Sequence, residues 1–175
     1  HNYTQRDLYK LDVQSGEILR VTDLPLSEET SPIYSSTGEW ILFVSDFNGI
    51  DNIYKMKADA FADSTLGGVT PITNSLNGIV QLSITGNDHT LAFSALYEGS
   101  YNIFVMENPL EKKTELDSLP KTRYMAQLWQ ERHFPKQDSV IIANNISQTD
   151  TTELKKGVEF FSGSYVDSTQ TYGDS

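Results

Sequence analysis

The chain of 175 residues is long enough for one domain, and its 24 Asp and Glu against 13 Lys and Arg give a net charge of -11. So negative a surface repels nucleic-acid phosphates and anionic lipid, and we expect neither as a partner. The chain has no cysteine, which excludes disulfides, thiolate metal sites and cysteine nucleophiles. It has no run of about 18 apolar residues, so no transmembrane segment is expected in it.

Short apolar runs between turn residues predict β-strands from the start of the chain to Pro109. Nine Tyr and eight Phe suit the half-buried, pleated surface of a sheet. In chain order, strands are expected within residues 7–13, 16–23, 41–46, 51–57, 68–74, 91–96 and 101–107.

A repeat organises these strands. Asn52-Ile53-Tyr54 returns 50 positions later as Asn102-Ile103-Phe104, and residues 7–12 form an earlier copy at an offset of 45. The unit of roughly 45 to 51 residues occurs about two and a half times between residues 7 and 109. Four short strands per unit at this period are typical of a propeller blade. A β-sandwich is the alternative, but it gives no reason for the same residues to recur at the same positions.

The sequence therefore predicts an all-β fold of about two to three four-stranded propeller blades, which is an incomplete propeller, followed by a mixed or irregular segment. Residues 1–109 are assigned to the blades, 110–161 to a connector and 162–175 to a polar linker or tail, with a strand at a sheet edge as the alternative for the tail. The connector is expected to pack on the last blade. It contains a short helix suggested by Met125, Leu128 and Trp129, and a strand at 139–145 from a degenerate blade or another domain. We expect the chain to be a piece of a larger protein.

The repeat resembles that of TolB-like β-propellers. The family unit has a Pro-x-aromatic-Ser-x-x-Gly turn, an apolar strand, a Ser-Asp-x-x-Gly turn and an Asp-Ile-Tyr strand. The matching positions in the two units are Pro32, Tyr34, Ser35, Gly38, Phe43, Ser45, Asp46, Gly49, Asn52, Ile53, Tyr54, Phe93, Gly99, Ile103 and Phe104. The second unit departs from the pattern at Leu82, Asp88 and Leu96. The same repeat occurs in prolyl-oligopeptidase-like peptidases and in large envelope proteins, so it is specific for the fold rather than the function.

One turn has the composition of a calcium site. Asp46, Asn48 and Asp51 surround Gly49, and oxygen ligands in a tight loop are what calcium requires. The glycine is misplaced and the bidentate Glu is missing for an EF-hand, so we favour a structural role in which Asp46 accepts hydrogen bonds from its own turn. Glu28 and Glu29 are expected on a solvated polar loop.

No catalytic constellation is recognised. His1, His89 and His133 lack metal-binding spacing, and residues 162–165 lack the glycine frame of a nucleophile elbow. We therefore expect no catalytic residue, no cofactor and no metal, and do not expect an enzyme.

The resemblance implies a non-catalytic protein-binding or scaffold module of a bacterial cell-envelope protein. Its expected location is periplasmic or outer-membrane-associated in a Gram-negative bacterium, and its expected partners are other envelope proteins or peptides and the rest of its own larger chain. No binding residue is assigned. The alternatives are a substrate-gating propeller of a larger serine peptidase of the prolyl-oligopeptidase type, with its catalytic residues elsewhere, and a structural array without a ligand.

Overall fold

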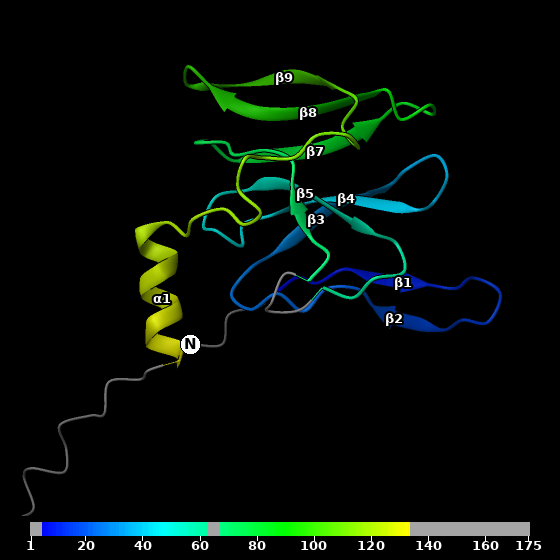
Figure 1. Cartoon of the computed structure of the whole chain (residues 1–175), viewed down its shortest axis with the longest axis horizontal. Coiled ribbons are helices and arrows are strands. Elements are labelled where there is room, and N and C mark those ends of the chain that lie inside the picture. The colour runs from blue at the N-terminus through cyan, green and yellow to red at the C-terminus, as the bar shows by residue number, and fades with distance from the viewer. Residues whose placement is uncertain (1–4, 63–66, 134–175) are drawn as a thin grey trace, which may run out of the picture. The chain divides into compact units, whose positions relative to one another are not determined.

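Three antiparallel sheets follow one another along the chain, as the computed structural model shows for residues 5–62 and 67–133 (Figure 1). All described residues lie in one unit, His1–Lys136. Its sheets are β1-β2, β3-β4-β5-β6 and β7-β8-β9, each with sequential neighbours paired. The elements are β1 (Tyr9–Leu11), β2 (Ile18–Arg20), β3 (Glu29–Tyr34), β4 (Trp40–Ser45), β5 (Asn52–Lys57), β6 (Thr70–Pro71), β7 (Ile79–Ile84), β8 (Thr90–Tyr97), β9 (Ser100–Glu107) and α1 (Arg123–His133).

The middle sheet, β3–β6, is buried on both faces, and we call it the central blade. On β5, Tyr54 and Met56 point to one face and Ile53 and Lys55 to the other, as the alternation of the sequence predicts. The face of Tyr54 packs with residues of the β1-β2 region, including Leu8. The face of Ile53 packs instead with residues of β7 and β8. Residues that flank β1 and β2 therefore cover one face of the central blade, and the β7-β8-β9 sheet covers the other. Successive propeller blades bury their surfaces in this way.

The backbone repeats with the same period as the residues. The β3-β4 and β7-β8 pairings shift register around Ser31 and Gln81, which are 50 positions apart and both have positive φ. Asp88, which stands where the first unit has Gly38, adopts φ 59° against 72° for the glycine. Aspartate tolerates this left-handed conformation better than most residues, so the turn survives the substitution.

Two strands were missing from the sequence-based prediction. β3 and β7 are the first strands of their sheets, in segments where only turn chemistry was recognised. They lie side by side, and the turns that follow them are joined. Asp88 accepts hydrogen bonds from Ser36 N at 2.8 Å and Ser36 Oγ at 2.6 Å. The first strands are thus where the central blade and the β7-β8-β9 sheet approach each other.

The segment after β9 contacts both sheets: Leu110 packs in the cluster that contains Leu91 and Ala95 of the last sheet, and the segment is also hydrogen-bonded to the central blade. The buried Lys55 donates from Nζ to the carbonyls of Leu110 and Lys112, at 2.5 and 2.7 Å. Thr114 N donates to the carbonyl of Pro71 at 3.1 Å. A lysine on an inner strand therefore holds the connector by satisfying carbonyls that have left the sheet.

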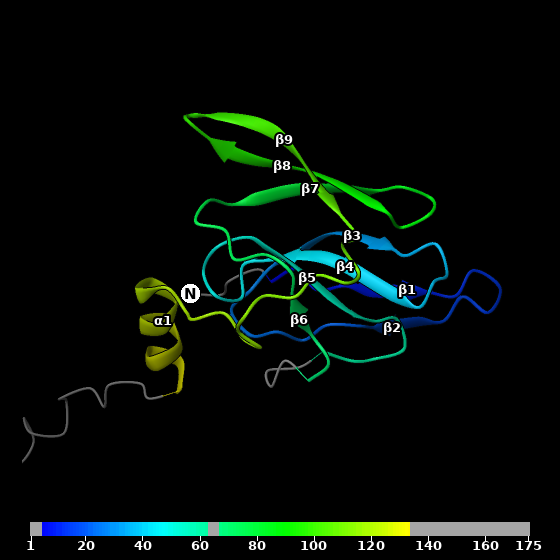
Figure 2. The same ribbon diagram turned by 45° about the horizontal axis from the view of Figure 1, so that its top comes forward.

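Helix α1 begins against the turn between β4 and β5. Thr122 N donates to Asn48 O at 2.7 Å, and the Thr122 hydroxyl accepts from Met125 N at 3.2 Å as an N-cap. Met125 is buried, and Trp129 meets Phe47 edge to face with ring centroids 6.1 Å apart. Across residues 5–62 and 67–133, no helix is both long and apolar enough to cross a membrane. Figure 2 shows α1 beside the sheets.

Tyr54→Phe should stabilise the protein. The Tyr54 hydroxyl is buried and has no hydrogen-bond partner among the described residues, and the equivalent position of the next sheet is Phe104. Removing an unsatisfied polar group should raise the free energy of unfolding by about 1 kcal/mol, measured by urea denaturation. Tyr34→Phe, on a half-exposed side chain, is the matched control and should change it by less than about 0.5 kcal/mol. A loss of stability in Tyr54→Phe would show that the hydroxyl is satisfied.

Gly49→Ala and Gly99→Ala form a second matched pair. Both glycines have positive φ, 96° and 81°, but a Cβ at Gly49 would overlap the Thr122 hydroxyl, whereas one at Gly99 meets nothing within 4 Å. Gly99→Ala should cost about 1 kcal/mol of unfolding free energy from backbone strain, and Gly49→Ala at least about 2 kcal/mol, by denaturant titration. Equal losses in the two variants would contradict the packing of Thr122 on this turn.

Candidate functional site

The turn that resembles a calcium site is built from internal hydrogen bonds. Asp46 Oδ1 accepts from Glu28 N at 2.7 Å, so its carboxylate holds a segment 18 residues earlier as well as its own turn. Asn48 Oδ1 accepts from Ile50 N and Asn52 Nδ2, both at 3.4 Å. In the described part of the chain, no three His, Cys, Asp or Glu side chains gather closely enough to hold a metal ion.

The carboxylates of this turn carry raised pKa values. Burial raises the pKa of Asp46, and the charge of Glu28 adds to the effect. Burial also raises the pKa of Asp51, helped by the charges of Asp46 and Glu28. The three acids therefore repel one another weakly across the end of the central blade.

The motif residues that mark the resemblance fall into three structural positions. The aromatic pairs stack across neighbouring strands, Phe43 with Tyr54 at 6.0 Å and Phe93 with Phe104 at 5.8 Å between ring centroids. The glycines, Ser35 and Asp46 lie in the turns between strands. The remaining strand residues of the motif are Pro32 and Tyr34 on β3, Ser45 at the end of β4, Asn52 and Ile53 on β5 and Ile103 on β9.

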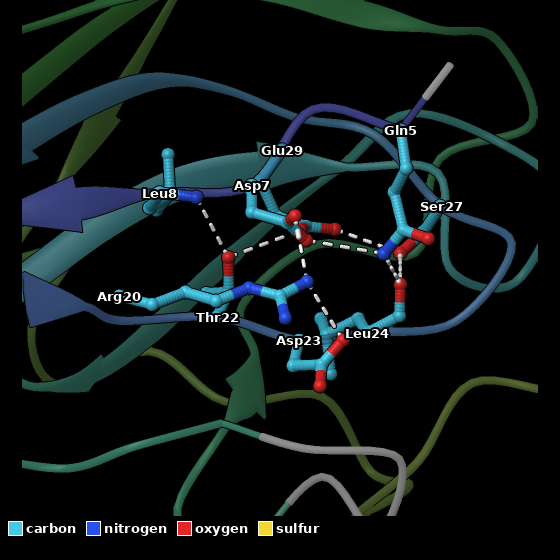
Figure 3. A network of polar contacts seen from close by, with 9 residues as sticks. All are labelled: Gln5, Asp7, Leu8, Arg20, Thr22, Asp23, Leu24, Ser27 and Glu29. Atoms are coloured by element: carbon cyan, nitrogen blue, oxygen red, sulfur yellow. Dashed lines mark hydrogen bonds and ion pairs between the residues drawn. The ribbon is translucent and has the colours of Figure 1, made fainter.

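A buried carboxylate, Glu29, lies between the β1-β2 sheet and the central blade (Figure 3). It begins β3, so the expectation of a solvated loop at this residue was wrong. Ser27 Oγ and Ser45 Oγ donate to its Oε1 at 2.7 and 3.0 Å, and Thr22 Oγ1 donates to Oε2 at 3.1 Å. Three hydroxyl groups thus donate hydrogen bonds to this carboxylate, as a cationic side chain does in an ion pair.

A second set of polar contacts continues from this carboxylate into the first sheet (Figure 3). Thr22 Oγ1 accepts from Leu8 N at 2.8 Å, which ties the residue before β1 to the loop after β2. Arg20 bridges Asp7 and Asp23, each at 2.7 Å. The network therefore connects residues 5–8, the loop after β2 and the end of β4 through side chains, in addition to the backbone hydrogen bonds between Leu8 and Val21 and the pairing of Glu29 with Ser45.

Burial determines the acidity of Glu29. Burial, with a smaller contribution from the charge of Asp7, raises the pKa of this carboxyl to about 7 against the lowering effect of the three hydroxyl hydrogen bonds. The carboxyl therefore changes its charge near neutral pH. Because Ser27, Ser45 and Thr22 are themselves buried, we interpret the cluster as a proton-binding group and not as a nucleophile with its base.

The interface between the central blade and the β7-β8-β9 sheet shows that the fold does not require a carboxylate at the position of Glu29. Glu29 pairs with Ser45 across β3 and β4, and the equivalent pair across β7 and β8 is Ile79 with Ala95. There, Thr73 Oγ1 accepts from Ile53 N at 2.9 Å and donates to Asn52 at 3.0 Å, repeating the role of Thr22. The offset of 50 could have revealed the burial of Glu29, because it aligns this residue with a buried isoleucine.

Glu29→Gln should remove a pH dependence of stability. A carboxyl whose pKa is higher in the folded chain than in the unfolded chain binds its proton more tightly when folded. Its contribution to the free energy of unfolding is therefore fully present below about pH 4.5 and is lost as the pH rises through about 7. The difference between the pKa of about 7 and the ordinary value of 4.5 corresponds to at most about 3 kcal/mol of unfolding free energy. Urea denaturation between pH 5 and pH 8 should show the parent losing stability with pH more steeply than Glu29→Gln, which should be the more stable of the two at pH 8.

The exposed Glu17→Gln variant is the control and should follow the parent's pH profile. Parallel profiles for the parent and Glu29→Gln would show that Glu29 does not titrate in this range.

No family model matches the chain, and no curated protein matches it. Solved structures do match. The putative TolB from Agrobacterium tumefaciens is similar with a TM-score of 0.50 at 23% identity, over 59% of this chain and 38% of that one. TolB from Acinetobacter baumannii has a TM-score of 0.47 at 19% identity, over 64% of this chain and 28% of its own. The chain therefore spans less than half the length of either protein. The match to the Agrobacterium protein shows that the described residues have the fold of TolB-like β-propeller blades.

Proposed function

We propose that this chain is a non-catalytic protein-binding module of a cell-envelope protein in a Gram-negative bacterium, and that it works in the periplasm. The observation that carries the proposal is the blade architecture it shares with the putative TolB from Agrobacterium tumefaciens. TolB-like propellers act through their surfaces, and on this resemblance we propose the same mode of action for this chain. The partners proposed are other envelope proteins or peptides, together with further parts of a longer polypeptide.

The first strands of the sheets offer the binding surface. In a propeller these strands surround the central channel, and here β3 and β7 lie side by side with their turns joined through Ser36 and Asp88. Tyr34, at the end of β3, leaves 48% of its surface exposed. Tyrosine is enriched at binding hot spots because it combines a large apolar ring with a hydroxyl and few rotatable bonds. We therefore propose that a peptide or protein segment contacts the chain at Tyr34.

Site-specific photo-crosslinking in the periplasm of a Gram-negative host tests this proposal. A photoreactive phenylalanine at Tyr34 should give one saturable adduct. Excess unlabelled chain should compete this adduct away, and a Pro32→Ala change in the same chain should weaken it. The same probe at Val13, in the β1-β2 hairpin and 87% exposed, is the matched control and should give none. Equal adducts at both positions, or none at Tyr34, would contradict a binding surface on the first strands.

A further inference from the structure

Two of the three hydroxyl groups around Glu29 pass on the hydrogen bond of a backbone amide. Thr22 Oγ1 accepts from Leu8 N at 2.8 Å and donates its own proton to Glu29 Oε2. Ser45 Oγ accepts from Phe47 N at 3.2 Å and donates its proton to Glu29 Oε1. Each of these hydroxyls therefore has one donor and one acceptor beside it, and its single proton is sufficient.

The third hydroxyl, that of Ser27, lies between two oxygens instead (Figure 3). Its Oγ is 2.7 Å from Glu29 Oε1 and 3.0 Å from the carbonyl oxygen of Leu24. A hydroxyl has one proton, so Ser27 cannot donate to both oxygens when Glu29 is ionised. A protonated Glu29 removes the conflict, because its own O–H donates to Ser27 Oγ and the Ser27 proton goes to Leu24 O. Both contacts are thus satisfied only when Glu29 carries a proton.

The charged groups around Glu29 also disfavour a negative charge there. Glu29 is buried and forms no ion pair within residues 5–62 and 67–133. From the first sheet it faces the negative charge of Asp7, which is itself paired with Arg20. On the central blade, Tyr54 is buried near the negative charges of Glu29 and Asp46. An ionised Glu29 is therefore a buried charge without a counter-ion.

The residues that hold Glu29 also hold the segment before β1. The amide of Leu8 depends on Thr22, and the carbonyl of Leu8 accepts from Val21 N at 2.7 Å. The backbone of Glu29 takes part as well, because its N–H donates to Arg6 O at 2.9 Å. Residues 5–8 are thus bonded to the chain on both sides of the buried carboxyl.

We propose that Glu29 carries a proton in the folded chain, shared with Ser27, and that its loss to solvent releases residues 5–8 and 21–28 from the central blade. The ionised carboxyl leaves Ser27 with two acceptors for one proton, and opening lets water solvate the charge. Burial raises the pKa of Glu29 to about 7 from an ordinary 4.5, so the released state gains population as the pH rises from about 5 to about 7.

Infrared difference spectra between about pH 6 and pH 9 test for the proton itself. The parent should lose the C=O stretching band of a protonated carboxyl as the pH rises, and Glu29→Gln should lack this component. Identical difference spectra for the parent and the variant would show that Glu29 is ionised throughout, which would contradict the proposal.

Residue-resolved amide hydrogen exchange tests the release. The protection factors of the Leu8 and Val21 amides should fall by up to about tenfold for each pH unit between about pH 5 and pH 7 and level off above it, because opening returns Glu29 to its ordinary pKa. The Ile72 amide, which donates to Ile53 O at the other interface of the central blade, should change much less.

Two matched variants complete the exchange experiment. Glu29→Gln keeps the shape of the side chain and has N–H groups that can donate to Ser27, but it does not ionise, so its Leu8 protection factor should be nearly independent of pH. Glu28→Gln, the same change on the half-exposed neighbouring residue, should follow the parent. A pH dependence that survives in Glu29→Gln would overturn the proposal, and so would an equal fall at Ile72, which indicates global unfolding instead of local release.

Discussion

The burial of both faces of β4 and β5 is the constraint on which the rest of the structure depends. β4 is a nearly continuous apolar run, and β5 is buried at every residue but its last, because alternate side chains contact two different neighbours. Ile41 and Phe43 meet the β1-β2 region, while Leu42 and Val44 meet the β7-β8-β9 sheet. A sheet of this kind cannot be stable without a neighbour on each side, so the unit recurs along the chain and each copy supports the next.

Two ionisable side chains of the central blade, Lys55 and Glu29, are buried and hydrogen-bonded to groups from other segments. Lys55 lies on a buried strand and is accommodated because two carbonyls of the returning connector accept its hydrogen bonds. Burial lowers the pKa of its ammonium group, with a contribution from the charge of Lys113. Glu29 is held in the same way by three hydroxyls. The equivalent residues Val105 and Ile79 are apolar, so each of these polar insertions has a sister position that lacks it.

Much of this fold could be predicted from the sequence because residues and backbone repeat with one period. The recurrence of Phe43 and Phe93, and of Gly49 and Gly99, reflects the same stacked pair and the same turn in two sheets. β3 and β7 were missed because a register shift with positive φ at Ser31 and Gln81 interrupts their alternation. Glu29 was missed because its burial depends on Ser45 and Thr22, which come from other segments. The expected strand at 139–145 and tail at 162–175 lie outside the described residues, and the proposed domain boundaries remain predictions.

Backbone hydrogen exchange in dilute solution, resolved by residue, tests the central claim most directly. If the central blade is covered on both faces, the amides of β4 and β5 should exchange slowest and those of β1, β2 and β9 much faster, because β1 and β2 are exposed at every residue and β9 is packed on one face only. Uniform exchange across the three sheets would contradict the account, and so would slower exchange in β9 than in β5.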